Sequence, residues 1–309
     1  MNLTSLLSRY KSSGSKELEI AENIRPLHAS TVYHVGSTWM GFSAIRRLVI
    51  FGDSYSSVEF LNDEERPSAT DPLGIDFPGL TYNESGLPNW VGHLITKYCP
   101  EPRYNPENRD KQTEAWNNSP LLVHDYAKGG QTVAGVQSQI ANLFLPTLGK
   151  KPKWAPWTAQ ETLFITWVGI NDCGVFADPA DVLEGLFTSQ ERLYKAGARN
   201  FLFFDVPTLH LSLDRQAKLL EVIRKWNTVL GEQINRFSSK HKDATVLRFS
   251  AFRVFEVLLD DPETFGLDPA DLYRRGGSIW MDHIHPTSAV HDHIASNVAD
   301  FLSEIPSKQ

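Results

Sequence analysis

Short runs of consecutive apolar residues recur along the chain from about residue 45 onward. They have the length of β-strands, and the clearest five lie at 48–51, 121–123, 163–168, 201–204 and 245–247. Continuous apolarity, rather than alternation of apolar and polar residues, is typical of strands that are covered on both faces. The pattern therefore predicts a parallel sheet buried between layers of helices.

Helical periodicity fills the intervals between these strands. Apolar residues three or four positions apart occur over 133–144, 182–194 and 290–302. The clearest stripe of this kind is formed by Leu219, Ile223, Trp226, Leu230, Ile234 and Phe237. Strands that alternate with helices predict a doubly wound α/β sheet, a fold that binds its ligands at the carboxyl ends of the strands.

Residues 1–38 lack this regular pattern. They are rich in serine up to residue 15 and contain one amphipathic piece at 18–24. We predict a loosely docked N-terminal arm over 1–38 and a single domain over 39–309. Within that domain, 55–90 and 99–120 are long segments rich in Pro, Gly, Asn and charge. Long loops of this kind are often walls or lids of a functional site, although disordered insertions are the alternative.

Composition and net charge exclude some classes of binding partner. The 309 residues are 41% hydrophobic and 22% charged, as in ordinary globular proteins. Thirty basic and 37 acidic side chains give a net charge of −7, which argues against nucleic acid or an anionic membrane as the main partner. No apolar stretch reaches the ~18 residues of a membrane span, and the N-terminus does not resemble a secretory signal. We expect a soluble, cytoplasmic monomer.

Two sequence blocks suggest a nucleophile and its base. Ser54 follows Gly52 and Asp53 at the end of the first predicted strand, where a hydroxyl would lie at the carboxyl edge of the sheet. Asp282 and His285 are three positions apart, so the carboxylate could accept the Nδ1 proton of the imidazole. Taken singly, Asp53 or Ser54 could merely cap a helix, and the Asp-x-x-His pair could be solvated surface.

Two further blocks follow the second and third predicted strands. Gly130 could offer an unobstructed backbone N–H, and Asn171 a side-chain amide, to an oxyanion that develops during acyl transfer. Alone, each is equally consistent with a turn glycine or an Asx turn.

Cysteines and histidines give little support to a disulfide framework or a metal site. Cys99 and Cys173 could form at most one bridge, and we expect two free thiols. Four histidines cluster in the sequence near the C-terminus: His283, His285, His291 and His293. Two of them fall in a helical pattern in which positions i and i+2 diverge. We therefore expect no metal and no cofactor.

The four blocks, taken in order, resemble the SGNH (GDSL-type) ester hydrolases. Gly52–Ser54 matches the nucleophile block of that family and Gly130 falls at its oxyanion-hole glycine. Gly169–Asp172 matches the Gly-x-Asn-Asp block, and Asp282–His285 the Asp-x-x-His block. The stretch Trp39–Ser56 is similar to the fungal branch that includes carbohydrate acetylesterases.

This resemblance implies a flavodoxin-like, three-layer α/β/α fold and a serine esterase mechanism. Ser54 would be the nucleophile, His285 the base and then the acid, and Asp282 the residue that orients it. The Ser54 and Gly130 N–H groups and the Asn171 side chain would form the oxyanion hole. The expected substrate is a short-chain acyl ester, most simply an O-acetyl group on a small molecule or carbohydrate. Lys128 departs from the family pattern, which has small or apolar residues at that position.

Other functions are compatible with the same blocks. An acyltransferase would use the same triad to deliver the acyl group to an alcohol, and a lipase would accept long acyl chains. A non-catalytic binding protein that retains the fold is a more distant alternative. Aromatic residues interspersed with polar ones in the two long loops favour a hydroxyl-rich substrate over a fatty chain: Tyr55, Tyr82, Trp90, Tyr104 and Trp116.

Overall fold

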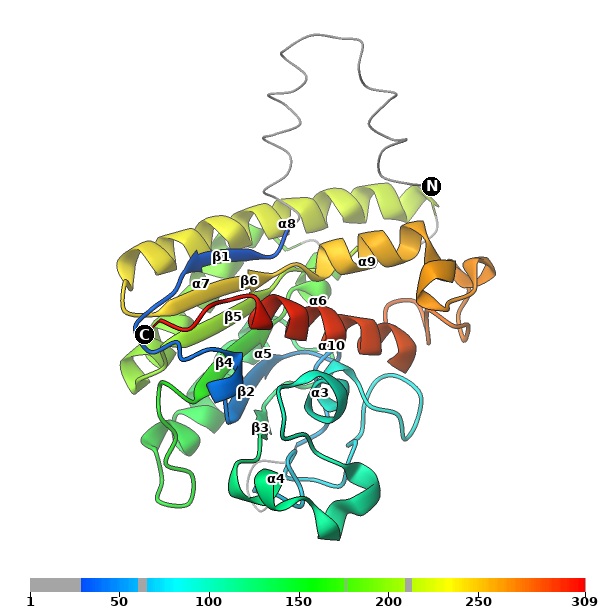
Figure 1. The fold of residues 1–309 in the computed structure, drawn as a ribbon. Coiled ribbons are helices and arrows are strands. Elements are labelled where there is room, and N and C mark those ends of the chain that lie inside the picture. Colours follow the sequence, from blue (N-terminus) through cyan, green and yellow to red (C-terminus); the bar gives the residue numbers. More distant parts are fainter. Residues whose placement is uncertain (1–28, 61–65, 176, 209–212, 309) are drawn as a thin grey trace.

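A six-stranded sheet forms the centre of the computed structural model (Figure 1). The structure describes residues 29–60, 66–175, 177–208 and 213–308, although not the side chains of 213–217. The strands are β1 (Thr31–His34), β2 (Arg47–Gly52), β3 (Leu122–Asp125), β4 (Thr162–Trp167), β5 (Asn200–Phe204) and β6 (Thr245–Phe249). The five apolar runs thus became β2 to β6, as predicted.

The strand order is β1-β6-β5-β4-β2-β3, and β2 to β6 are parallel. If these five strands are counted along the chain, their spatial order is 2-1-3-4-5, which is the flavodoxin-like order. The chain leaves β2, the second strand from one edge, first toward the edge strand β3 and then, on the other side, toward β4. Ligands of doubly wound sheets bind at this switch point, beyond the carboxyl ends of the strands.

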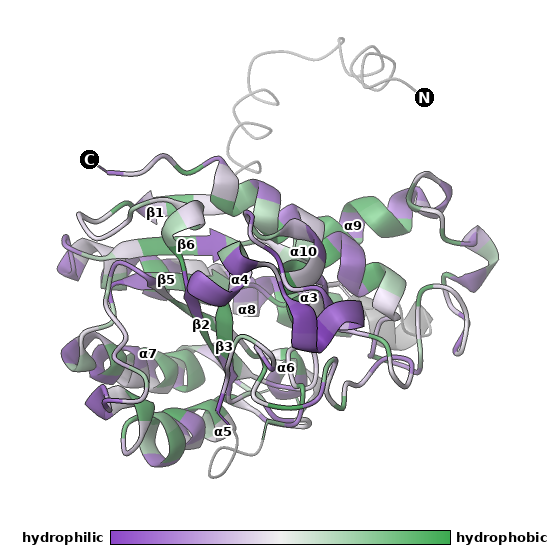
Figure 2. Ribbon diagram, turned by 60° about the horizontal axis from the view of Figure 1, so that its bottom comes forward, coloured by the Kyte–Doolittle hydropathy of each residue, from purple (hydrophilic) through white to green (hydrophobic). Residues whose placement is uncertain are grey.

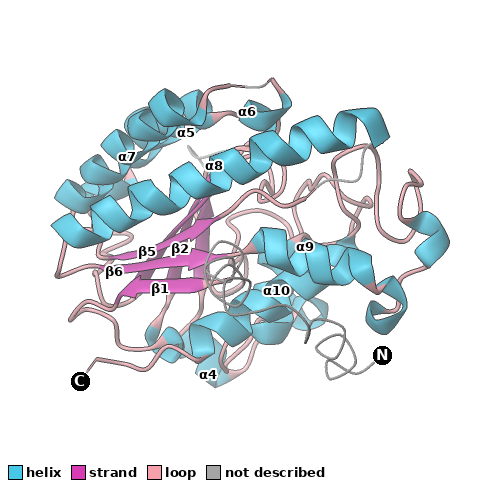
Figure 3. Cartoon of the chain, turned by 90° about the horizontal axis from the view of Figure 1, so that it is seen from above, coloured by secondary structure: helices cyan, strands magenta, loops and turns pink. Residues whose placement is uncertain are grey.

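Helices cover both faces of the sheet, which confirms the predicted three-layer α/β/α fold. Figure 3 shows α5, α7 and α8 on one face and α9 and α10 on the other, and α3 packs against α10. The helices are α3 (Trp90–His93), α4 (Glu114–Asn118), α5 (Val133–Ser138), α6 (Ile170–Gly174), α7 (Pro179–Ala196), α8 (Leu213–Lys240), α9 (Ala251–Asp260) and α10 (Ser288–Ser303).

Several shorter helical segments complete the chain. The π-helical segments Leu94–Tyr98 and Gln139–Phe144 continue α3 and α5. The 3-10 helices are Phe42–Ala44, Pro106–Lys111, Leu148–Lys150, Pro262–Phe265 and Pro269–Asp271. None of the described helices is both long and apolar enough to cross a membrane.

Local sequence signals explain where α7 begins and ends. The Asp178 side chain accepts a hydrogen bond from the Ala180 N–H, and Pro179 occupies the first turn, where its missing N–H costs nothing. Gly197 ends the helix in a left-handed conformation with φ 108°. Figure 2 shows α7 with polar and apolar residues side by side. Strand β2, in contrast, is apolar from Leu48 to Phe51 and buried over these residues. This contrast is expected for a helix with one buried face and a strand buried on both.

The structure corrects the predicted boundary of the N-terminal arm. Residues 31–34, assigned to the arm, form β1 and pair antiparallel with β6, with Val32 opposite Leu247. The Gly36 N–H also donates to the Thr245 side chain at 3.0 Å. Four residues at a sheet edge carry too short an apolar pattern to be recognised as a strand. The amphipathic piece at 18–24 lies outside the described residues.

Candidate active site

Ser54 lies directly after strand β2, at the end where β2 and β4 run side by side. A Cβ at Gly52 would overlap the Trp167 carbonyl, so only glycine lets β2 and β4 approach this closely at their ends. The chain then turns sharply, and the N–H groups of Ser56 and Ser57 both donate to the Asp53 carbonyl. This turn places the Ser54 side chain at the carboxyl edge of the sheet, where it was predicted, and next to the switch point between β2 and β4.

A chain of hydrogen bonds joins Ser54 to His285 and Asp282. The Nε2 atom of His285 lies 2.9 Å from Ser54 Oγ, and its Nδ1 lies 2.6 Å from Asp282 Oδ2. If Nδ1–H donates to the carboxylate, Nε2 is left to accept the serine proton. The structure thus brings together the three residues that the sequence pointed to from opposite ends of the chain.

Asp282 holds both the ring and the backbone of the histidine loop. Its Oδ1 accepts hydrogen bonds from the N–H groups of Ile284 and His285, each at 2.8 Å. Partial burial acts to raise the pKa of Asp282, but the hydrogen bonds from the His285 side chain and these two N–H groups outweigh it. The net pKa lies below its usual range, so the carboxylate stays ionised beside the imidazole.

Asp53 resembles a cap, one of the alternatives considered for this block. Its Oδ1 accepts from the Tyr55 N–H at 3.1 Å, which closes an Asx turn. Burial raises the pKa of Asp53 to about 7, the Tyr55 N–H opposes the shift, and the nearby Asp172 adds to it. Asp53 therefore shapes the turn, while Ser54 turns its hydroxyl toward His285.

The two predicted oxyanion residues are linked through Gln131, the residue that follows Gly130. Gly130 adopts φ 73° in an exposed turn, and a Cβ at this position would have no other atom within 4 Å. The Asn171 side chain donates through Nδ2 to the Gln131 carbonyl at 2.8 Å, directly after that turn. The carboxylate of Asp172 accepts from the Val133 N–H at 3.3 Å, at the start of α5. These bonds attach the turn that contains Gly130 to helix α6. That Gly130 and Asn171 donate to an oxyanion stays a prediction.

The remaining histidines of the C-terminal group point to different neighbours. His283 is exposed, His291 is buried beside the Tyr55 ring, and His293 bonds the Phe265 carbonyl at 3.0 Å. Among the described residues, no three His, Cys, Asp or Glu side chains gather in a way that could hold a metal ion. Cys99 and Cys173 are both free and buried, as expected.

The expectation that loop aromatics form a substrate surface is largely wrong. Four of the five are almost fully buried: Tyr55, Trp90, Tyr104 and Trp116. Trp116 donates to the Ala69 carbonyl and Tyr104 to the Thr70 carbonyl, so the second loop packs against the first. Aromatic rings favour burial wherever their polar atom finds a partner. Tyr82, at 39% exposure, is the exception.

Tyr55 and Tyr82 contact the loop Asp282–His285, and the sequence analysis did not predict these contacts. The Tyr55 hydroxyl donates to the Ile284 carbonyl, next to His285. The Tyr82 ring stacks on the His285 imidazole, with ring centroids 5.3 Å apart and an interplanar angle of 30°. Both tyrosines follow Ser54 in the long loop 55–90, but nothing in their spacing indicates a contact with the C-terminal block.

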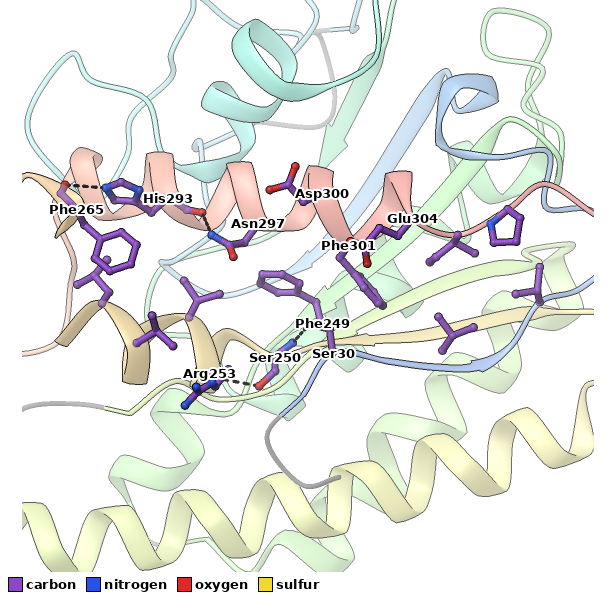
Figure 4. Close-up of a pocket in the computed structure, with 17 residues that line it drawn as sticks. Ser30, Phe249, Ser250, Arg253, Phe265, His293, Asn297, Asp300, Phe301 and Glu304 are labelled. Atoms are coloured by element: carbon purple, nitrogen blue, oxygen red, sulfur yellow. Dashed lines mark hydrogen bonds between the residues drawn. The ribbon is translucent and has the colours of Figure 1, made fainter. Parts of the chain in front are cut away.

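A separate hollow of about 770 Å³ lies between α9 and α10 (Figure 4). Arg253 lines it from α9, Asp300 and Phe301 line it from α10, and Glu304 lines it from the position directly after α10. None of the triad residues lines this hollow. The candidate active site is instead the region around Ser54, where this side chain meets His285 and Asp282.

Comparison with known proteins agrees with this geometry. No family model matches the chain. An acetylesterase of Thermothelomyces thermophilus is 31% identical over 283 residues, which cover 82% of this chain and 87% of that protein. A variant of an acetyl xylan esterase from Geobacillus stearothermophilus superposes with a TM-score of 0.51 at 13% identity, covering 86% of this chain and all of the other.

The fold and this site define a hydrolase that acts on carboxylic esters. Within that class, the chain belongs to the SGNH (GDSL-type) ester hydrolases. The fold similarity to the acetyl xylan esterase agrees with this assignment, although at 13% identity it supports the fold alone.

Proposed function

We propose that this protein is a serine esterase that removes acetyl groups from carbohydrate esters through an acyl-enzyme intermediate on Ser54. The observation that carries the proposal is the chain of hydrogen bonds from Ser54 through His285 to Asp282. A serine hydroxyl is a weak nucleophile until a base removes its proton, and this arrangement supplies a base with its tautomer fixed.

In the first half of the reaction, Ser54 Oγ forms a bond to the ester carbonyl carbon while its proton moves to Nε2 of His285. The tetrahedral intermediate then collapses, the bond to the alcohol oxygen breaks, and that oxygen takes the proton from Nε2. The Asp282 carboxylate stabilises the imidazolium in between. In the second half, water repeats the attack on the acyl-serine, and acetate and the free serine result.

Negative charge on the carbonyl oxygen needs donors placed before the reaction begins. The Ser54 and Gly130 N–H groups and the Asn171 amide are the proposed donors. Gly130 leaves its backbone unobstructed, and Asn171 is held by the Gln131 carbonyl at 2.8 Å. Donors fixed in this way cost no reorganisation when the charge develops.

The acetyl group is proposed from the 31% identical relative, which is an acetylesterase. The carbohydrate part is proposed from the polar character of the loops around the site and from the exposed ring of Tyr82 beside the base. An aromatic face next to hydrogen-bonding groups suits the alternating C–H and hydroxyl surfaces of a sugar.

Labelling of Ser54 tests the mechanism. We expect a fluorophosphonate to modify the wild-type protein once, at Ser54, as located by peptide mass spectrometry. Ser54→Ala should keep its thermal transition and lose both labelling and release of acetate from an acetylated methyl glycoside. Full activity in that variant would contradict the assignment of the nucleophile.

Histidine variants provide the matched control. His285→Ala should lose nearly all activity, whereas His283→Ala, two residues away and exposed, should keep most of it. Assays with and without an added alcohol acceptor, followed by product analysis, separate hydrolysis from acyl transfer. Transfer to the alcohol as the main outcome would replace the esterase with an acyltransferase.

A further inference from the structure

Three parts of the candidate active site meet at the side chain of Tyr82. Its ring lies over the His285 imidazole at 5.3 Å between centroids. Its hydroxyl donates to Glu59 Oε1 at 3.2 Å, five residues after the nucleophile. The same hydroxyl lies so close to Gly129 that a Cβ at this position would overlap it. Tyr82 therefore spans the base, the nucleophile loop and the turn that carries Gly130.

The segment that carries Tyr82 is tied down on both sides. The Leu80 N–H donates to the Val58 carbonyl at 3.1 Å. Asn83 Nδ2 donates to the Leu87 carbonyl at 3.1 Å, and Glu84 accepts from the Ser288 N–H at 2.7 Å, at the start of α10. Tyr82 is thus held in place while its side chain keeps 39% of its surface exposed.

The direction of proton transfer shows which part of an ester would lie beside Tyr82. The proton on His285 Nε2 must reach the leaving alcohol oxygen, so the alcohol part of the ester lies next to the imidazole. The carbonyl oxygen points toward the oxyanion donors. The acyl chain then extends away from both the imidazole and these donors. A ring stacked on His285 is therefore a neighbour of the alcohol part.

We propose that Tyr82 is a specificity-determining residue that binds the alcohol part of the ester by stacking against a sugar ring. This inference rests on the esterase function proposed above. Aromatic contacts of this kind contribute about 0.5–1.5 kcal/mol beyond the area they bury. A small alkyl alcohol is too short to cover the ring and gains none of this contact.

Glu59 contributes a second feature of this alcohol subsite. Its backbone adopts φ 58°, a left-handed conformation that is unfavourable for a residue with a side chain. One carboxylate oxygen accepts from Tyr82, and Oε2 has no hydrogen-bond partner among the described residues. An unengaged carboxylate oxygen at the edge of an aromatic ring is suited to accept a hydrogen bond from a sugar hydroxyl.

The test compares two acetyl esters that differ only in the alcohol: a monoacetylated methyl glycoside and ethyl acetate. For Tyr82→Ala we expect kcat/KM on the glycoside ester to fall about tenfold, mainly through KM, while the value for ethyl acetate stays within about twofold. Tyr82→Phe retains the ring and should retain most of the discrimination. Trp154→Ala is the control, because this exposed aromatic contacts Arg66 and His124.

Other results would overturn the assignment. An equal loss of kcat on both esters in Tyr82→Ala would mean that the ring only positions His285. An acyl-length optimum that moves to longer chains, with the alcohol held constant, would place Tyr82 on the acyl side. No change on either ester would remove Tyr82 from the site altogether.

Gly129 offers an independent route to the same side chain. Gly129→Ala must displace the Tyr82 hydroxyl, so it should reproduce the selective loss seen in Tyr82→Ala. In the Tyr82→Ala background the three atoms nearest to the added methyl group are absent, and we expect no further loss. A further loss of more than about threefold on both esters would mean that Gly129→Ala acts on the oxyanion turn and not through Tyr82.

Failure of the alcohol subsite is distinguishable from failure of the proposed function. Wild-type turnover of ethyl acetate, abolished in Ser54→Ala, establishes esterase chemistry whatever Tyr82 does. If neither ester is hydrolysed by the wild-type protein, the proposed function itself is wrong. If both are hydrolysed and Tyr82→Ala discriminates as the wild type does, only the subsite is wrong.

Discussion

The side-chain amide of Asn171 carries two hydrogens, and the Gln131 carbonyl engages one of them at 2.8 Å. The second is available for an oxyanion, and the first fixes the direction in which it points. This arrangement makes Asn171 both a proposed donor and a tie to the Gly130 turn. Its removal should therefore affect the transition state more than the binding of the ground state.

For Asn171→Ala we expect kcat to fall by roughly 10²–10³, with little change in KM, because the hydrogen bond strengthens as the charge develops. Steady-state kinetics on a short acetyl ester measure both constants, and near-wild-type thermal unfolding confirms that the variant is folded. A defect confined to KM would mean that Asn171 binds substrate in the ground state instead.

At the scale of single residues, the sequence predicts side chains whose chemistry is defined by their immediate neighbours. Ser54, Asp282 and His285 lie in short blocks whose residue types already define a nucleophile, an orienting acid and a base. The contact between Tyr82 and His285 depends on how a long loop folds over the site, and no short-range pattern encodes it. Because the folding of this loop is not encoded in short-range patterns, the sequence also does not show that Tyr55 and Trp90 are buried and therefore not part of a substrate surface.

Helix α10 carries a buried histidine that should make folding sensitive to acid. Burial, with smaller contributions from the neighbouring His93 and His285, lowers the pKa of His291 to about 3. The Tyr55 ring lies against it, and its Nδ1 has no hydrogen-bond partner among the described residues. Protonation of His291 is thus costly in the folded protein and ordinary in the unfolded chain, where its pKa is about 6.5.

The sign of the pH effect follows from proton binding. Between about pH 6.5 and pH 3 the unfolded chain binds a proton at His291 that the folded protein does not. The stability due to neutral His291 is fully present above pH 6.5 and falls with decreasing pH, by up to about 1.4 kcal/mol per pH unit. His291→Gln should remove this contribution and flatten the acid side of the stability curve.

Urea unfolding at several values between pH 7 and pH 4.5 measures this slope for the wild type and the variant. His283→Gln serves as the control, because that side chain is exposed and should leave the slope unchanged. Parallel curves for the wild type and His291→Gln would show that the buried histidine does not control acid sensitivity.

The chain just after the edge strand β1 packs tightly against the loop before β6, and Gly36 allows this contact. A Cβ on Gly36 would overlap the Asp243 carbonyl oxygen and lie 2.7 Å from the carbonyl carbon of Ala244. Both neighbours are backbone, so the strain cannot be relieved by rotating a side chain. We expect Gly36→Ala to cost about 1–3 kcal/mol of unfolding free energy.

Gly174→Ala is the matched control, because a Cβ there meets nothing within 4 Å. It should change the unfolding free energy by no more than about 0.5 kcal/mol. Equal stability of the two variants, measured by denaturant unfolding, would mean that β1 is not held against the loop before β6 as the structure shows.

For the molecule as a whole, alternation of strands and helices was sufficient to predict a doubly wound sheet. The strand order was not accessible in this way, because β2 pairs with both β3 and β4 through backbone hydrogen bonds, which the side-chain pattern of a strand does not specify. Packing of whole helices against the sheet decides between such neighbours. The switch point that results between β2 and β4 is what brings Ser54 close to the Asn171 block.

The floor beneath the candidate active site is filled by large side chains. Tyr55 contacts Trp167 edge to face at 5.2 Å, and Trp167 stacks on Phe204 at 4.8 Å. Trp90 packs against Phe204 at 5.1 Å. All four rings are almost fully buried, so the space below Ser54 is occupied. The hollow between α9 and α10 is not lined by Ser54, His285 or Asp282.

A tunnel would strongly favour long acyl chains, since each buried methylene contributes about 0.8 kcal/mol. Six additional methylenes, from acetyl to octanoyl, would then add roughly 5 kcal/mol to binding in the transition state. With the floor filled, those methylenes stay in water and only hinder access to Ser54. We therefore expect kcat/KM to be highest for acetyl and propionyl esters and at least tenfold lower for octanoyl, in a series with one constant alcohol. An optimum at eight carbons or more would show that a long acyl site opens when substrate binds, and the protein would then be a lipase.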